Sequence, residues 1–249
     1  MNCYYNKRKL EGNLNEDRND SGKFAGGLRK ALFGVFSRRF CAGRFFWCGE
    51  QAADFGGIGV SQHLPLRIYI GLKPNNIGAF RLVDFKEFTA TKFKFFSINF
   101  KEFNFTQVFS HINTIKKAKQ GYDVYIVSEI PVSCGLNSLG ALSAALSLLF
   151  YIVEGKVDKN KIDSWSGTMA SKIISDADFN LVFRLAWKLN AILHSGYCPP
   201  IRAFVPLVWS ELPVFCASEK IAKKENFIEK IDTLNYFAGS MDELSNSKN

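Results

Sequence analysis

The chain has 249 residues, of which 47% are hydrophobic and 22% are charged. It is therefore long enough to bury a core and has the composition of an ordinary globular protein. Its 32 basic residues outnumber its 23 acidic residues, and the formal net charge of +9 favours anionic partners such as nucleotides, phosphosugars, nucleic acid or an acidic membrane. The six cysteines are scattered without a Cys-x-x-Cys pair and only three histidines accompany them, which argues against a zinc site.

Two segments bear on location. Residues 1–27 are mostly polar and contain no apolar stretch that would act as a secretory signal, so we expect a polar N-terminal tail, reduced cysteines and a cytoplasmic protein. Residues 136–153 carry no charge and approach the length that crosses a bilayer. Asn137, Gly140 and three serines interrupt them, and we interpret the segment as a buried core helix.

The first half of the chain after the tail is dominated by strand patterns. Apolar spacing predicts a short helix near residues 28–36. Alternation predicts strands at residues 64–72 and 79–84, joined as a β-hairpin by a Pro-Asn-Asn turn between them. Phenylalanine then alternates with lysine, threonine and asparagine over residues 86–105, which is typical of a half-buried strand. A surface that stacks nucleic-acid bases is the alternative for this segment.

The second half is dominated by helix patterns. A strand at residues 122–128 is expected to lead through a glycine turn into the core helix that begins near Ser138. The other expected helices cover residues 108–119, 158–171 and 178–193, and residues 201–216 read as strand. Residues 218–249 are expected to add little core.

The turn at residues 130–141 is the segment most indicative of chemistry. A phosphate chain needs converging backbone N–H donors and small residues that let the backbone come close. Small residues fill the turn, and the helix that follows adds the positive end of its dipole. Ser138 can cap that helix or reach a phosphate-bound Mg²⁺. No Gly-Lys-Ser/Thr follows, so the turn is not a Walker A loop, and an ordinary capped helix is the alternative.

The turn resembles the ATP-binding loop of the GHMP kinases, the superfamily of galactokinase, homoserine kinase and mevalonate kinase. The resemblance rests on Pro131-x-x-x-Gly135-Leu136-x-Ser138, and residues 121–131 are similar to the galactokinase branch. About ninety residues upstream, residues 41–57 and Leu64-Pro65 resemble the sugar-binding signature of galactokinases and arabinose kinases, and we expect this segment to be the partner of the turn in one site. The resemblance implies an α+β fold, in which helices pack on a mixed, mostly antiparallel sheet, with ATP and Mg²⁺ as cofactors.

The resemblance also assigns roles to individual residues. Arg44 matches the arginine at the reacting centre and would stabilise developing negative charge as a catalytic residue. Carboxylates accept hydrogen bonds from sugar hydroxyls, and the implied sugar-binding residues are Glu50, Asp54 and Gly57. Ser138 is the implied metal ligand. The implied nucleotide-binding residues are Pro131, Ser133, Cys134, Gly135, Leu136, Asn137 and Ser138.

The chain also departs from the family pattern. Gln51 stands where galactokinases have histidine, Ser133 replaces a glycine, and Leu139 occupies the position of the serine that helps to bind Mg²⁺. The family's catalytic aspartate belongs to a Gly-x-Met-Asp-Gln segment, and the best match, at residues 195–200, has Pro199 instead of a carboxylate. Asp176 and Asp178 do not fit that motif, and helix capping is the expected role of both.

These observations lead to one main reading and two alternatives. The main reading is a galactokinase-like, ATP-dependent sugar kinase with an impaired catalytic site. The first alternative is a remnant or regulatory module that binds nucleotide and sugar without turnover. The second is a basic nucleic-acid binder, which the sequence disfavours because the basic residues near its start are not interleaved with stacking aromatics. We expect residues 28–216 to form the N-terminal domain of such a kinase and residues 217–249 to be a remnant of its second domain. A separate chain that supplies the missing domain is a further expected partner.

Overall fold

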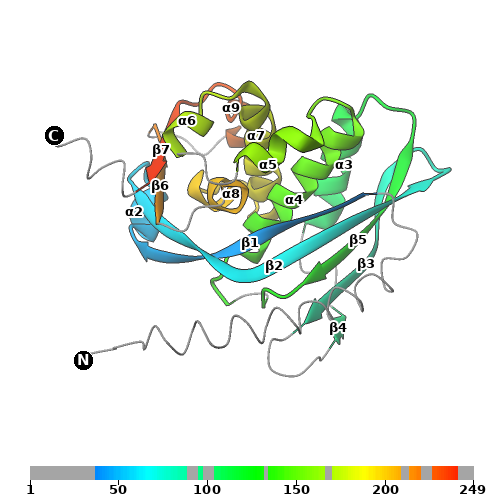
Figure 1. Cartoon of the computed structure of the whole chain (residues 1–249), viewed down its shortest axis with the longest axis horizontal. Coiled ribbons are helices and arrows are strands. Elements are labelled where there is room, and N and C mark those ends of the chain that lie inside the picture. The colour runs from blue at the N-terminus through cyan, green and yellow to red at the C-terminus, as the bar shows by residue number, and fades with distance from the viewer. Residues whose placement is uncertain are drawn as a thin grey trace. The chain divides into compact units, whose positions relative to one another are not determined.

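The computed structural model describes residues 37–88, 95–97, 104–131, 134–165, 170–208, 213–219 and 226–240. The polar tail, the helix expected near residues 28–36 and most of the phenylalanine-rich segment lie outside these residues. The described elements form one mixed sheet with helices packed against it (Figure 1). This confirms the expected α+β class.

The sheet has seven strands, and the long strand β2 organises it. Six strands follow the order β4-β3-β5-β2-β6-β7, and β1 pairs with the other edge of β2. All pairs are antiparallel except β3 with β5. The strands are β1 (Ser37–Cys48), β2 (Gly59–Asn75), β3 (Phe80–Phe88), β4 (Phe95–Ser97), β5 (Gly121–Ser128), β6 (Val214–Ser218) and β7 (Tyr236–Ser240).

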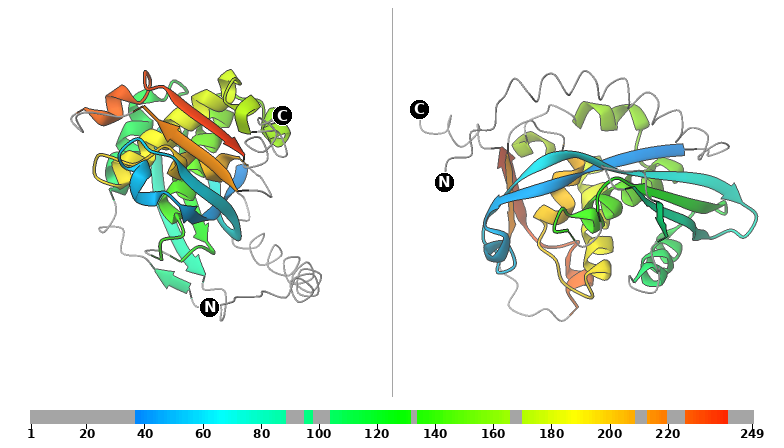
Figure 2. Two further views of the ribbon diagram at one scale, coloured as in Figure 1. Left: turned by 90° about the vertical axis from the view of Figure 1, so that its left-hand side faces the viewer. Right: turned by 90° about the horizontal axis from the view of Figure 1, so that it is seen from below.

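Strand β2 is long enough to serve two neighbours along one edge. Its second half pairs with β5, whereas its first three residues pair with β6. On this edge of β2, pairing with β5 ends at Ile68 and pairing with β6 ends at Ser61. The chain therefore leaves β5 beside a stretch of β2 that pairs with neither strand. Figure 2 shows β6 and β7 side by side at the far end of the sheet.

The β-hairpin expected between residues 64–72 and 79–84 is wrong. Both segments are strands, but β5 lies between them and pairs with each. The side chains of Val124 and Ile126 on β5 are fully buried, as expected of a central strand, because such a strand is covered rather than exposed to solvent. A local turn signal carries no information about a strand that arrives some forty residues later.

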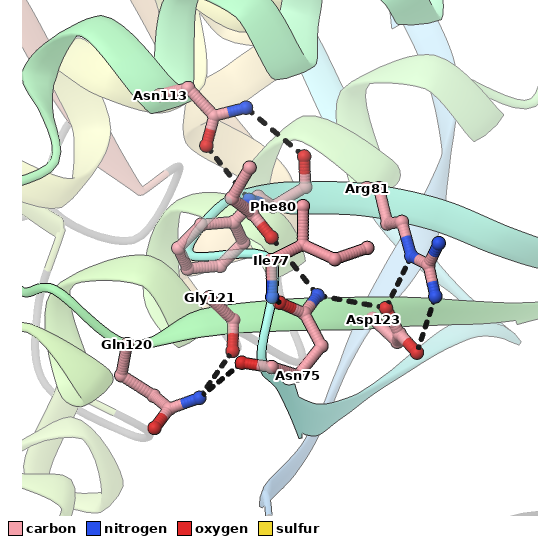
Figure 3. A network of polar contacts seen from close by, with 9 residues as sticks. Asn75, Ile77, Phe80, Arg81, Asn113, Gln120, Gly121 and Asp123 are labelled. Atoms are coloured by element: carbon pink, nitrogen blue, oxygen red, sulfur yellow. Dashed lines mark hydrogen bonds and ion pairs between the residues drawn. The ribbon is translucent and has the colours of Figure 1, made fainter.

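Polar side chains fasten β5 to its two neighbours (Figure 3). Asp123 on β5 accepts hydrogen bonds from Asn75 Nδ2 at 2.8 Å and from Arg81 Nε at 2.6 Å. The side chain of Arg81 is half exposed, so water screens this ion pair and its contribution to stability is small. Its main effect is to link β2, β5 and β3 at a single carboxylate.

Helix α3 (Phe105–Ile115) is attached to the same corner. The Asn113 amide accepts a hydrogen bond from the Phe80 N–H at 2.8 Å and donates to the Phe80 carbonyl at 3.1 Å (Figure 3). The Gln120 side chain donates to the carbonyls of Asn75 and Gly121. These contacts satisfy backbone groups that would otherwise be unpaired where the strands end.

The helices pack on one face of the sheet (Figure 1). Helix α7 and the predicted core helix α4, which is buried almost all round, match the sequence patterns closely, whereas α3 covers residues 105–115 instead of the expected 108–119. Within the described residues no helix is long and apolar enough to span a membrane. The helical elements are α2 (Glu50–Ala53), α3 (Phe105–Ile115), α4 (Ser138–Val153), α5 (Lys159–Trp165), α6 (Ala170–Ile173), α7 (Ala177–Leu193), α8 (Ile201–Phe204), the 3₁₀ helix η2 (Val205–Leu207) and α9 (Phe227–Lys230).

Two expectations for the C-terminal part are wrong. Residues 201–207 are helical rather than extended, and among the described residues of this region only β6 is a strand. Every residue of α8 and η2 except Arg202 is buried. In such a continuous apolar run, the spacing of apolar residues cannot distinguish a strand from a helix.

The second error concerns residues 218–249, which were expected to add little core. The described part supplies the buried side chains of Phe227, Ile231 and Leu234, and β7 completes the sheet beside β6. Burying a large apolar side chain contributes roughly 1.5–3 kcal/mol, so this segment stabilises the same core. Its assignment to a second domain stays a prediction.

Candidate functional site

The glycine turn leads directly into the N-terminus of α4. Gly135 has φ +73°, and a Cβ at this position would have no atom within 4 Å, so the glycine serves backbone conformation and leaves open space in front of it. Asn137 also has a left-handed backbone, and its side chain does not cap the helix. The first intrahelical hydrogen bond is donated by Ala141. The N–H groups of the first turn therefore remain available for a ligand.

The upstream motif lies against this turn, as the sequence pairing predicts. The Arg44 N–H donates to the Leu136 carbonyl at 3.1 Å. A Cβ on Gly43 would lie 3.1 Å from the same carbonyl oxygen and 3.1 Å from the Ile130 side chain. The pairing of β1 with β2 shifts register between Ala42 and Arg44, which turns the Arg44 N–H away from the ladder and toward the loop.

The structure buries Arg44. Its side chain is 2% exposed, its guanidinium carbon lies 3.6 Å from the centre of the Phe46 ring, and Nη1 approaches Ser61 Oγ at 3.5 Å. The ring holds the guanidinium by a cation–π contact. Arg44 is thus positioned beneath the site rather than on its surface.

The rest of the predicted sugar-binding motif forms the short helix α2 and its flanks. Gly49 precedes α2 with φ +78°, and a Cβ there would lie 2.1 Å from the Ile58 carbonyl oxygen. Glu50 is the first residue of α2 and Asp54 follows its end. The Gly57 N–H donates to the Ala52 carbonyl at 2.8 Å. Gly49 and Gly57 are therefore required by the local backbone, whatever ligand the segment binds.

A cavity of about 420 Å³ joins this motif to the segment that follows α7. The Tyr197 hydroxyl approaches the Ala53 carbonyl at 3.4 Å, and Trp187 Nε1 donates to the Cys198 carbonyl at 2.8 Å. These contacts hold the segment against α2 and α7. The cavity is lined by Asp54, His194, Ser195, Gly196, Tyr197, Pro199 and Arg202.

His194 and Arg202 are cavity residues that the sequence analysis missed. Arg202 Nη1 lies 3.4 Å from His194 Nε2. A guanidinium has only donors, so this ring nitrogen is the acceptor and Nδ1 carries the proton. Burial, then the charges of Arg202 and Arg44, lower the pKa of His194 to about 4, so the ring is neutral at pH 7. Both residues flank the segment that was aligned with the family's catalytic motif. This position in the sequence could have indicated them.

Acids and thiols contribute little to this cavity. Pro199 lines it where the family pattern has aspartate, and Asp54 is the one carboxylate among the described residues that line it. Burial raises the pKa of the Cys198 thiol to about 12, so this cysteine is no nucleophile. The described part of the chain also holds no group of three or more His, Cys, Asp or Glu side chains suited to a metal ion.

The helix N-terminus and the cavity share a wall. Asn137 Nδ2 donates to the Arg202 carbonyl at 2.8 Å. A Cβ on Gly140 would lie 2.1 Å from that carbonyl oxygen, so α4 and α8 meet with no room for a side chain. Of the other predicted loop residues, Cys134 is exposed, Pro131 is half-buried and Ser138 opens α4. Ser133 lies outside the described residues, and the ligand roles of all these residues stay predictions.

Comparison with known proteins gives similarity in structure but not in sequence. No family model matches the chain, and no curated protein matches it. Galactokinase from Lactococcus lactis, solved with galactose, is 12% identical with a TM-score of 0.52 over 86% of this chain and 50% of that one. The Lin0012 protein from Listeria innocua is 10% identical with a TM-score of 0.51 over 80% and 56%. Mevalonate kinase from methicillin-resistant Staphylococcus aureus is 17% identical with a TM-score of 0.47 over 72% and 51%.

This chain spans about half the length of each of these three proteins. At such identities the likeness concerns the fold alone. The structural neighbours include kinases of the GHMP family, and the described part of this chain has their mixed α+β fold.

Proposed function

We propose that this chain is a galactokinase-like kinase that binds ATP at the glycine turn and a sugar beside Asp54. The observation that carries the proposal is the contact between the two motifs, in which the Arg44 N–H donates to the Leu136 carbonyl of the turn. Phosphoryl transfer needs a phosphate site and a hydroxyl-binding site close together. The fold of the neighbours supports the same class of activity.

The turn fits a phosphate chain. Gly135 faces open space, and the N–H groups of Ser138, Leu139 and Gly140 donate to no acceptor among the described residues. The positive end of the α4 dipole favours an anion there by about 0.3–1 kcal/mol at an exposed site. When bound, ATP would supply the phosphoryl group and Mg²⁺ would screen its charge. The Ser138 hydroxyl, at the start of α4, is the side chain that would face the metal.

The protein's own groups would act around this phosphate. Arg44 would supply positive charge from beneath the site, where burial strengthens its field. Asp54 would accept hydrogen bonds from the sugar, and neutral His194 would donate one through Nδ1. Catalysis would consist of positioning and charge stabilisation, since no carboxylate occupies the position of Pro199.

A second candidate function is binding of nucleotide and sugar without turnover. The observation that favours it is Pro199, which cannot accept a proton from the attacking hydroxyl. Neutral His194 does not replace the missing base, because its Nε2 faces Arg202 and burial lowers its pKa to about 4. The two candidates differ in turnover rather than in binding.

Calorimetric titration with Mg-ATP, with and without galactose or arabinose, tests both candidates. We expect Mg-ATP to bind, and Ser138→Ala to weaken binding about tenfold, because the hydroxyl would face Mg²⁺. The control is Ser143→Ala, since Ser143 Oγ donates within α4 to the Leu139 carbonyl. Release of ADP with galactose supports the kinase, and binding without ADP release supports the second candidate. No heat with any nucleotide contradicts both.

A further inference from the structure

A second cavity, of about 320 Å³, lies in the helical layer. It shares no lining residue with the cavity beside Asp54. Helices α3, α4 and α7, which lie together in Figure 1, form its walls with the turn after α9. Its polar lining consists of His111, Tyr151, Lys156, Arg184, Lys188 and Asp232.

Helix spacing explains why cations and apolar groups line the same cavity. Leu181, Arg184, Leu185 and Lys188 follow one another at intervals of three, one and three residues, so they share one face of α7. Phe150 and Ile115 complete an apolar wall. The cavity therefore combines a cationic part with an apolar part, the usual composition of a small-molecule site.

The cations are held in place, but their charge is only partly compensated. Arg184 Nη1 donates to the carbonyls of Ile231 and Leu234, which orients the guanidinium without neutralising it. Lys156 lies 5.2 Å from the centre of the Tyr151 ring and makes no ion pair within the described residues. Lys188 pairs with Asp232. Three cations thus face one carboxylate.

His111 adds no positive charge at neutral pH. Burial, then the charge of Lys188, lower the pKa of its imidazole, although Asp232 acts in the opposite direction. The local excess is therefore two positive charges, beside aromatic and aliphatic side chains. An inorganic cation is excluded by this charge, and a neutral apolar ligand would leave the cations uncompensated.

We propose that this second cavity binds a phosphomonoester, with the phosphate at Lys156 and Arg184 and the organic group against the apolar wall. Lysine and arginine supply strong charge-assisted hydrogen bonds to phosphate oxygens. A volume of about 320 Å³ is at the lower end of the range for small-molecule pockets. The proposal is independent of the kinase site, because neither Asp54 nor the glycine turn contributes.

Histidine NMR provides the test. Of the chain's three histidines, His111 lines this cavity and His194 lines the cavity beside Asp54. The full chain is titrated with phenyl phosphate, inorganic phosphate and phenol. We expect phenyl phosphate to shift the His111 ring resonances and to bind more tightly than either of its parts. His194 should not respond to it. If His194 shifts and His111 does not, the probe occupies the first cavity and the proposal is wrong.

Two variants move the affinity in opposite directions. Lys156→Met removes a cation that makes no ion pair with any described residue and should weaken phenyl phosphate binding about tenfold. Asp232→Asn removes the carboxylate and should tighten it about threefold. The control is Lys159→Met, an exposed lysine that does not line the cavity. Equal affinity of all three variants for phenyl phosphate would overturn the proposal. That result would not bear on binding of Mg-ATP at the glycine turn.

Discussion

Replacement of Gly140 by alanine tests how tightly α4 meets α8. The new Cβ would lie 2.1 Å from the Arg202 carbonyl oxygen and 2.4 Å from the Asn137 side chain. Ordinary van der Waals contact begins at 3.4 Å, so the backbone of one helix must move by about 1.3 Å, the difference between 3.4 and 2.1. A backbone oxygen cannot rotate out of the way as a flexible side chain can.

The expected cost follows from two opposing effects. Alanine in a helix interior is favoured over glycine by about 1 kcal/mol. Overpacking of a well-packed site costs about 1–3 kcal/mol and occasionally more, and the collision with a carbonyl oxygen belongs at the upper end. We therefore expect Gly140→Ala to lower the free energy of unfolding by about 2 kcal/mol.

Urea unfolding followed by tryptophan fluorescence measures this difference. Gly135→Ala is the matched control, because it meets no atom within 4 Å and adds only the left-handed backbone strain, about 1 kcal/mol. Gly140→Ala should also shift the His194 resonances through Arg202, and Gly135→Ala should not. Removing the Asn137 side chain should not rescue Gly140→Ala, since the carbonyl remains. A Gly140→Ala protein that equals or exceeds the native stability would refute the reasoning.

Two further predictions concern single side chains. The pKa of His194 is about 4 in the folded chain and about 6.5 in the unfolded chain. As the pH falls, the imidazole is therefore protonated in the unfolded chain before it is protonated in the folded chain. Stability should fall as the pH drops from about 6.5 to about 4, and a His194 resonance that titrates near 6.5 would contradict this. Asp176 caps α7 by accepting from the N–H groups of Asp178 and Phe179. Asp176→Ala should cost about 1 kcal/mol in urea unfolding and Asp176→Asn much less; equal losses in the two variants would count against capping.

Local patterns predicted the elements whose signals lie within a few residues of each other. The helix at 178–193 corresponds to α7 within a residue, because a capping aspartate and an apolar stripe at helical spacing occur together there. The strand at 122–128 and the helix from Ser138 are confirmed as well, since an apolar strand pattern, a glycine turn and an uncharged apolar run are also local signals. The long uncharged run is a core helix because sheet and helices cover it on every side.

The candidate site was predicted in part. The pairing of the Arg44 segment with the glycine turn follows from the motif order and is confirmed by the Arg44 to Leu136 contact. Burial of Arg44 against Phe46, and the presence of Arg202 and His194 in the cavity, were not predicted. No local pattern marks the burial of Arg44, because it depends on which segments pack around it, whereas Arg202 and His194 were marked only by their position on either side of the segment aligned with the family's catalytic motif.

The sequence by itself determined the strand–turn–helix unit and the position of its glycine, since backbone conformation and hydrophobic periodicity act over short distances, and its resemblance to the GHMP kinases implied the fold class. The tertiary structure alone decided that β5 separates β2 from β3, that residues 201–207 are helical and pack against α4, and that the cavity beside Asp54 and the cavity lined by His111 lie at different places. These features depend on contacts between residues far apart in the chain, and the free energy of burial that selects them is shared by the whole core.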